Sequence, residues 1–152
     1  MRFQQVLVAV DGSEFAAHAL QVASGIATAL GARVGLIHVI DPQLVGSETG
    51  VPADQMWALL RRDGETLLGT AASAIPAHPH PWKFLREGIP WKEVVQSARE
   101  WPADLIVVGT HGRSGLTRLL FGSTAEGVVR HAPVPVVVVP PASQSGEGGR
   151  DT

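Results

Sequence analysis

Apolar residues follow two patterns that alternate along this chain. Short apolar runs are typical of strands buried in a parallel sheet, and regular three-to-four-residue spacing is typical of helices that pack by one face. The expected strands are residues 6–10, 34–40, 82–88, 104–108 and 133–139, of which 82–88 alternates apolar and polar positions and is expected to be half exposed. The expected helices are residues 16–30, 56–75, 90–98 and 124–131. This β-α alternation predicts an α/β fold, a five-stranded parallel sheet with helices on both faces.

Residues with special backbone preferences mark the ends of the expected helices. Ser13 is a favourable N-cap for the first helix, and Gly31 is typical of a helix end. Pro90 suits the first turn of the third helix. Ser123 and Glu126 have the spacing of a capping box, so we expect Ser123 to cap the last helix.

The last expected strand, Val134–Val139, contains Pro135 and is rich in valine. A proline within a strand is typical of a sheet edge, because proline cannot donate to the ladder. A bare valine-rich edge promotes aggregation, so we expect something to cover it. A second copy of the same strand is the simplest cover, which predicts a homodimer through Val134–Val139.

A glycine-rich segment, residues 109–123, connects the fourth expected strand to the last helix. Glycines allow close backbone approach, and the free N–H groups of a helix N-terminus attract anions. The segment lacks the Gly-Lys-Ser/Thr of a P-loop, and its glycine spacing differs from the G-x-G-x-x-G dinucleotide fingerprint. We interpret it as a loop that holds the phosphates of a nucleotide; the alternative is a tight turn that only closes a βα unit.

Asp11 follows the first expected strand, at the edge of the sheet where parallel strands present their carboxyl ends. If the first and fourth strands are neighbours at the switch point of strand order, Asp11 and Gly109 share one crevice. Asp11 then contacts the ligand, or it only caps the following helix. Its carboxylate repels phosphate unless a metal intervenes or it faces the ribose.

Three charged or titratable side chains in the segment are further candidates. Arg113 and Arg118 are its fixed cations, and either can pair with phosphate oxygens or remain a solvated surface residue. His111 is a candidate phosphate contact or general base, against the alternative of a surface histidine without a carboxylate partner. His38, within the second strand, is expected to be packed.

Composition restricts the remaining classes of function. The 152 residues suit one domain, expected over 1–140, with a polar Gly/Ser-rich tail over 141–152 that we expect to be disordered. A net charge of −2 and scattered tryptophans do not favour nucleic acid, and no apolar run approaches membrane-spanning length. There is no cysteine and no signal-peptide pattern, so the cytoplasm is the expected compartment.

The spacing G-x2-G-x9-G-S from Gly109 to Ser123 resembles that of the universal stress protein family. The resemblance extends over nearly the whole chain. It includes the opening Val-Ala-Val-Asp-Gly-Ser (8–13), the Gly-Ile-Pro turn (88–90), the strand ending at Gly109, and the closing Arg-His-Ala-Pro-Val-Pro-Val (130–136). It implies an open Rossmann-like sandwich of the adenine nucleotide alpha-hydrolase-like type.

Intact loop glycines mark the ATP-binding branch of that family, so the resemblance implies ATP, bound with Mg²⁺. The implied phosphate contacts are Gly112, Arg113, Gly122, Ser123 and Thr124, and Gly109 and His111 are further candidate residues of the nucleotide site. The implied adenine pocket is lined by Ala9, Val10, Val39 and Val108. Asp11 lies near the nucleotide in this interpretation, on the adenine or ribose side or as a ligand of Mg²⁺ carried by the nucleotide.

The leading hypothesis is an ATP-binding, dimeric regulatory protein of the stress response that acts as a nucleotide-dependent switch. The segment holds no lysine and no nucleophile beside a histidine, so no catalytic residue is assigned. One alternative is a slow ATPase or an adenylyl-transferring enzyme, and another is a nucleotide-free dimeric scaffold. Turnover abolished by changing one side chain would favour the first, and failure to bind any nucleotide would favour the second.

Overall fold

The computed structural model describes residues 2–46, 50–76, 80–110 and 122–142, and within them the chain forms an α/β fold with one parallel sheet. The strands are β1 (Gln5–Ala9), β2 (Arg33–Ile40), β3 (Trp82–Glu87), β4 (Leu105–Gly109) and β5 (Val136–Val139). The helices are α1 (Glu14–Leu30), α2 (Ala53–Ser73), α3 (Pro90–Glu100) and α4 (Ser123–His131), with a short 3₁₀ helix η1 (Pro42–Leu44) before α2. The strand order is β3-β2-β1-β4-β5, with every pair parallel.

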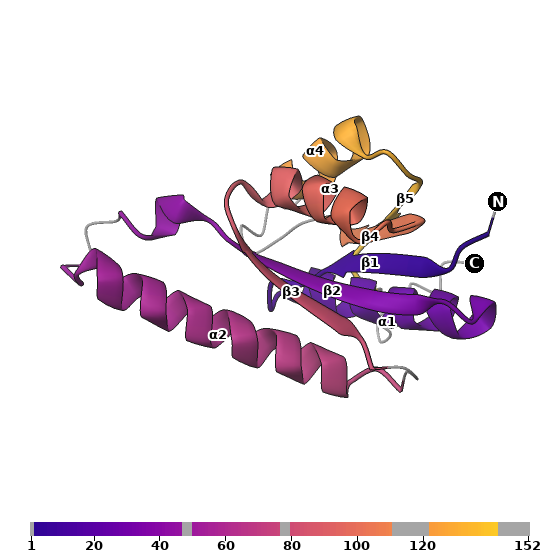
Figure 1. The fold of residues 1–152 in the computed structure, drawn as a ribbon, viewed down its shortest axis with the longest axis horizontal. Helices are drawn as coiled ribbons and strands as arrows, with labels where there is room; N and C mark the ends of the chain where they lie inside the picture. The colour runs from indigo at the N-terminus through magenta and orange to yellow at the C-terminus, as the bar shows by residue number, and fades with distance from the viewer. Residues whose placement is uncertain (1, 47–49, 77–79, 111–121, 143–152) are drawn as a thin grey trace, which may run out of the picture.

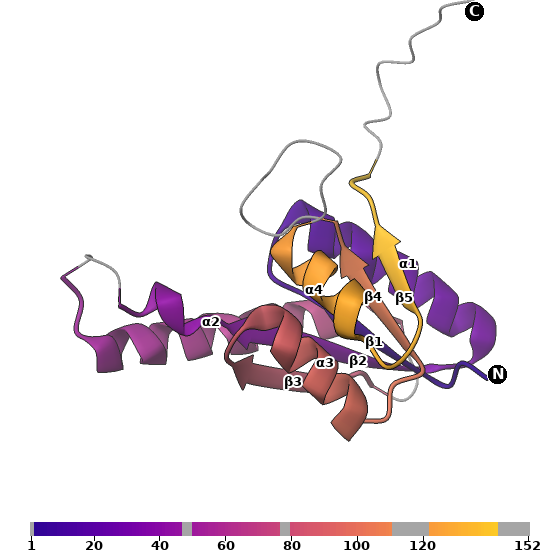
Figure 2. The ribbon, with the colours of Figure 1, turned by 90° about the horizontal axis from the view of Figure 1, so that it is seen from above.

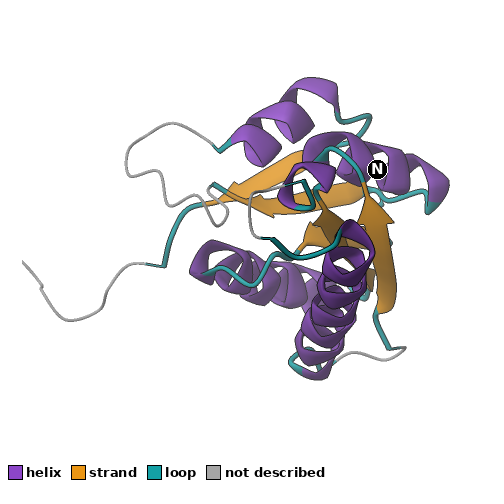
Figure 3. Cartoon of the chain, turned by 90° about the vertical axis from the view of Figure 1, so that its left-hand side faces the viewer, coloured by secondary structure: helices purple, strands orange, loops and turns teal. Residues whose placement is uncertain are grey.

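The helices cover the two faces of the sheet in pairs (Figure 1 and Figure 3). On one face, α1 and α2 bury Val6, Val8 and their neighbours. On the other face, α3 and α4 bury Leu7 and Ile106. Successive residues of β1 thus enter different cores, and Val6, Leu7 and Val8 are all fully buried. This explains the unbroken apolar runs, and the predicted five-stranded, two-faced sandwich is confirmed.

Three of the four predicted helix boundaries are correct. The Ser13 hydroxyl accepts a hydrogen bond from the Ala16 N–H at 3.2 Å, Gly31 has the left-handed φ of 64°, and Pro90 begins α3. The predicted capping box at Ser123 and Glu126 is not formed. The N-cap of α4 is Gly122, because its carbonyl accepts the Glu126 N–H at 2.9 Å and its own backbone is extended.

The β5 strand lies at the edge of the sheet, as predicted, but it is shorter than the sequence pattern indicated. It begins at Val136, so Pro135 precedes the strand. The Pro135 carbonyl still accepts the Ile106 N–H at 3.0 Å, because proline loses only its donor. The strand order therefore shows that β5 is an edge strand, and Pro135 is not needed to explain its position.

Gly127 of α4 lies against the root of the Trp91 side chain of α3, and the Trp91 ring stacks on His131 with 4.2 Å between ring centroids.

The first half of α2 projects beyond the strands (Figure 1 and Figure 2), and most of its residues up to Arg62 are exposed. No helix in the described ranges has the length and apolar character needed to cross a membrane. Residues 143–152, most of the expected tail, lie outside the described residues.

Candidate nucleotide site

The adjacent strands β1 and β4 lead into helices on opposite faces of the sheet. The chain leaves β1 toward α1 on one face, and it reaches α4 on the other face after β4. The carboxyl ends of two such strands leave a crevice between them, which is where ligands bind in open α/β sheets. The prediction that the first and fourth strands are neighbours, with Asp11 and Gly109 at one crevice, is confirmed.

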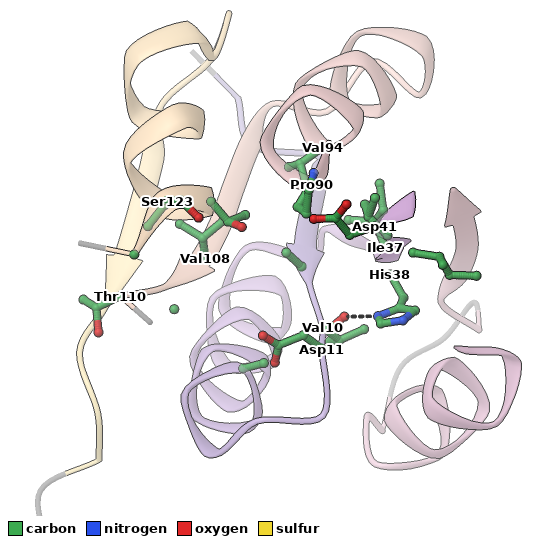
Figure 4. Close-up of a pocket in the computed structure, with 18 of the residues that line it drawn as sticks. Val10, Asp11, Ile37, His38, Asp41, Pro90, Val94, Val108, Thr110 and Ser123 are labelled. Carbon is green, nitrogen blue, oxygen red and sulfur yellow. Dashed lines mark hydrogen bonds between the residues drawn. The ribbon is translucent and has the colours of Figure 1, made fainter. Parts of the chain in front are cut away.

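A cavity of about 360 Å³ occupies this crevice, within the usual size range of small-molecule sites. Its lining includes nine of the twelve residues predicted for the site: Ala9, Val10, Asp11, Val39, Val108, Gly109, Gly122, Ser123 and Thr124. The other three, His111, Gly112 and Arg113, lie outside the described residues, as does Arg118. Figure 4 shows the side chains around the cavity.

Apolar side chains from both halves of the sheet form the floor and one wall of the cavity. Val10, Ile37 and Val108 come from the strand ends, and each is at most 5% exposed. Val94 and Pro90 of α3 lie above them. Such a slot suits a flat, uncharged group.

The opposite side of the cavity is the N-terminus of α4, where Gly122, Ser123 and Thr124 lie. Within the described residues no side chain caps this nine-residue helix. The first N–H groups of a helix have no partner within the helix and carry a partial positive charge. This side of the cavity therefore favours an anionic group.

The two described ends of the glycine-rich segment meet at the cavity. The Gly122 N–H donates to the Thr110 carbonyl, and the Thr110 N–H donates to the Val139 carbonyl at 3.0 Å. Gly109 has a separate reason to be glycine: a Cβ there would lie 3.0 Å from the backbone oxygen of Phe15 in α1. Close packing against α1 thus accounts for this glycine without any ligand.

His38 was expected to be packed, and the structure gives it a specific contact. Its Nδ1 lies 2.8 Å from the carbonyl oxygen of Val10, so Nδ1 carries the proton and donates. One side of the half-buried ring faces Gly64 of α2, and the residue also lines the cavity. No sequence pattern indicated this contact, because it depends on how β1 and β2 align at their ends.

Two carboxylates lie on the cavity, and the sequence analysis found one of them. Asp11 accepts the Ser13 N–H at 2.9 Å, so it shapes the turn before α1 while Ser13 is the cap. Asp41, directly after β2, accepts the Gln43 N–H at 2.9 Å and caps η1. Asp41 was missed because a single aspartate beside Pro42, after the expected strand 34–40, forms no binding motif.

The described donor set does not by itself form a metal site. Across residues 2–46, 50–76, 80–110 and 122–142, no group of three His, Cys, Asp or Glu side chains could hold a metal ion. Mg²⁺ commonly binds through one or two carboxylates together with phosphate oxygens and water. The residues present fit only that mode, with Asp11 as a carboxylate ligand and a nucleotide supplying the rest.

The chain matches the model of the universal stress protein family over residues 2–140. It is 34% identical to a universal stress protein of Methanocaldococcus jannaschii, over 90% of this chain and 82% of that protein. Among solved structures it resembles the hypothetical protein MJ0577, with a TM-score of 0.81 and 26% identity over 92% of this chain and 97% of that one.

Two further solved relatives contain adenine nucleotides. One is a universal stress protein from Archaeoglobus fulgidus in complex with dAMP, with a TM-score of 0.64 and 26% identity over 91% of this chain and 99% of that one. The other is a universal stress protein in complex with cAMP, with a TM-score of 0.63 and 28% identity over 91% of this chain and 98% of that one. Sequence motifs, sheet order, cavity position and family match agree, and the chain belongs to the universal stress protein family.

Proposed function

We propose that this chain binds ATP in the crevice between β1 and β4, and that occupancy of the crevice controls a regulatory homodimer in the stress response. The observation that carries the proposal is one cavity with an apolar slot on one side and, on the other, the N-terminus of α4, which no described side chain caps. A nucleotide has the matching distribution of properties, with a flat, uncharged base at one end and phosphates at the other.

The adenine ring lies in the slot formed by Ala9, Val10, Val39 and Val108 in this proposal. The phosphates lie at Gly122, Ser123 and Thr124, where the backbone N–H groups of Ser123 and Thr124 and their two hydroxyls donate, with Gly109 at the rim. The glycine-rich segment adds His111, Gly112 and Arg113 on the sequence argument. Asp11 faces the ribose or binds Mg²⁺ that the nucleotide carries.

The solved structures of two relatives support an adenine nucleotide as the ligand. The complexes of two universal stress proteins with dAMP and cAMP show that the family accommodates an adenine nucleotide. The choice of ATP for this chain rests on the glycine spacing of residues 109–123. A longer phosphate chain gains contacts with that segment and with the positive end of α4.

Calorimetric titration of the nucleotide-stripped full chain tests the proposal. The titrants are ATP, ADP and AMP, each with and without Mg²⁺. We expect saturation near one nucleotide per chain and an affinity that rises with the number of phosphates. Absence of saturable binding at millimolar concentrations of all three would refute the proposal and favour the nucleotide-free scaffold. Steady release of phosphate from ATP would instead favour the slow ATPase.

The homodimer in this proposal forms through the free edge of β5. Strand order leaves that edge without a partner strand in the described chain, and four successive valines form it. Pairing of two such edges would satisfy their outward N–H and C=O groups.

A further inference from the structure

We infer that Asp41 is a specificity-determining residue of the proposed nucleotide site: its carboxylate selects bases that carry an exocyclic amino group on the edge facing β2. The inference rests on the proposed function and concerns which base is accepted. Asp41 directly follows Ile40, the last residue of β2, and lines the same cavity as the N-terminus of α4.

The charges of the cavity fix the orientation of a nucleotide. Phosphates are attracted to the N-terminus of α4 at Ser123 and repelled by the carboxylates of Asp11 and Asp41. Figure 4 shows Ser123 and Asp41 on opposite sides of the cavity, with Val108 and Pro90 between them. A nucleotide with its phosphates at α4 therefore directs its base along the apolar slot toward the end of β2.

The Asp41 carboxylate is held in place before any ligand arrives. It accepts the Gln43 N–H at 2.9 Å as the N-cap of η1, and its backbone is extended, with φ −81° and ψ 120°. The residue is half-buried, so water screens it less than a surface carboxylate. A carboxylate whose position is fixed in this way can act as a specific contact for a ligand.

An ionised carboxylate only accepts hydrogen bonds. Opposite position 6 of the purine, it pairs with the amino group of adenine and repels the carbonyl oxygen that hypoxanthine or guanine carries there. The ring N–H of those bases is at position 1, so it reaches the carboxylate only if the base shifts along the slot. Sites built to hydrogen-bond one group reject an analogue that lacks it, because the buried partner is then left unpaired. Asp41 therefore favours adenine over 6-oxo purines, whereas the apolar slot alone accommodates either ring.

The experiment compares ATP with inosine triphosphate, which carries a carbonyl oxygen and a ring N–H where ATP carries the amino group and a bare ring nitrogen. Both are titrated into the full chain and into Asp41→Asn. Asparagine caps a helix as well as aspartate does, and its amide both donates and accepts. We expect the parent to prefer ATP by about 10- to 100-fold, the range of a hydrogen bond to a charged group. In Asp41→Asn this preference should fall to within about 2- to 3-fold.

Asp54→Asn is the matched control, because Asp54 lies in the exposed first turn of α2 and does not line the cavity. It should retain the parental preference. Equal affinity of the parent for the two nucleotides, or an unchanged preference in Asp41→Asn, would overturn the inference and leave the proposed function standing. If the parent binds neither nucleotide, the proposed function fails, and this inference fails with it.

Discussion

The imidazole of His38 joins the end of β2 to the end of β1 through a 2.8 Å hydrogen bond from Nδ1 to the Val10 carbonyl. The Val10 N–H in turn donates to the Ile37 carbonyl at 2.8 Å. Both polar backbone groups of Val10 are therefore anchored to β2, one residue beyond the end of β1. These two hydrogen bonds fix the backbone at the floor of the cavity, and with it the position of Asp11, the next residue.

Replacement of His38 by leucine should lower both stability and nucleotide affinity. The Val10 carbonyl would lose its donor, which costs about 1–2 kcal/mol in the free energy of unfolding measured by urea denaturation. Asparagine keeps a donor near the position of Nδ1, so His38→Asn should recover part of the loss. A leucine variant as stable as the parent, with equal affinity for ATP, would show that this hydrogen bond does not organise the cavity.

Two helical glycines should respond in opposite directions to alanine. A Cβ at Gly127 would collide with the root of the Trp91 side chain, which cannot rotate away, so Gly127→Ala should destabilise by about 1–3 kcal/mol. Gly69 in α2 has open space around it, so Gly69→Ala should stabilise by about 0.5–1 kcal/mol. Urea midpoints of the two variants provide the measurement. A neutral Gly127→Ala would mean that α3 and α4 separate easily.

The backbone N–H of Ser123 should contribute to nucleotide affinity separately from its hydroxyl. Ser123 is the first residue of α4, a position that tolerates proline, and Gly122 before it already has the extended backbone, φ −61° and ψ 162°, that proline requires. Ser123→Pro removes the N–H and the hydroxyl, whereas Ser123→Ala removes only the hydroxyl. We expect Ser123→Pro to bind ATP about tenfold more weakly than Ser123→Ala, by calorimetry. Equal affinities would mean that the phosphates do not reach this N–H.

A proline at Val138 should separate the proposed dimer without breaking the internal sheet. The Pro135 carbonyl accepts a bond from Ile106 of β4, and the Val139 carbonyl accepts one from Thr110, directly after β4. By alternation the Val138 N–H faces the free edge. Light scattering should find the parent and Val138→Ala dimeric and Val138→Pro monomeric. A monomeric parent, or a dimeric proline variant, would contradict pairing through this edge. A charge at Val137 is a poorer test, because that side chain packs on the core beneath α1.

The architecture could be predicted from the sequence because its signals are local. Unbroken apolar runs such as 6–10 reflect burial on both faces, and Ser13 and Gly31 have backbone requirements that few residues meet. The prediction of a capping box was wrong because both Gly122 and Ser123 are residues that can precede a helix. The helix α4 begins at Ser123, one residue earlier than expected. Glu126 pairs instead with Arg130 on the helix surface, at 3.0 Å.

The site was only partly predictable, for a different physical reason. Asp11 and Gly122 could be found because each adjoins an expected strand or helix end and also belongs to a motif, Val-Ala-Val-Asp-Gly-Ser or the spaced glycines. Asp41 also follows an expected strand, but it belongs to no such motif, and its place on the cavity depends on the turn of η1. His38 reaches the cavity through the alignment of β2 with β1. Such contacts depend on tertiary geometry, so residue type and spacing do not reveal them.

The contact between Gly109 and the Phe15 backbone bears on how family members are sorted by sequence. A side chain at position 109 would push α1 away from β4 whether or not a nucleotide is ever bound. A relative that had lost its ligand would therefore still retain glycine here, and its presence carries no information about binding. Classification of uncharacterised members should therefore give glycine at position 109 less weight than the other positions of the motif.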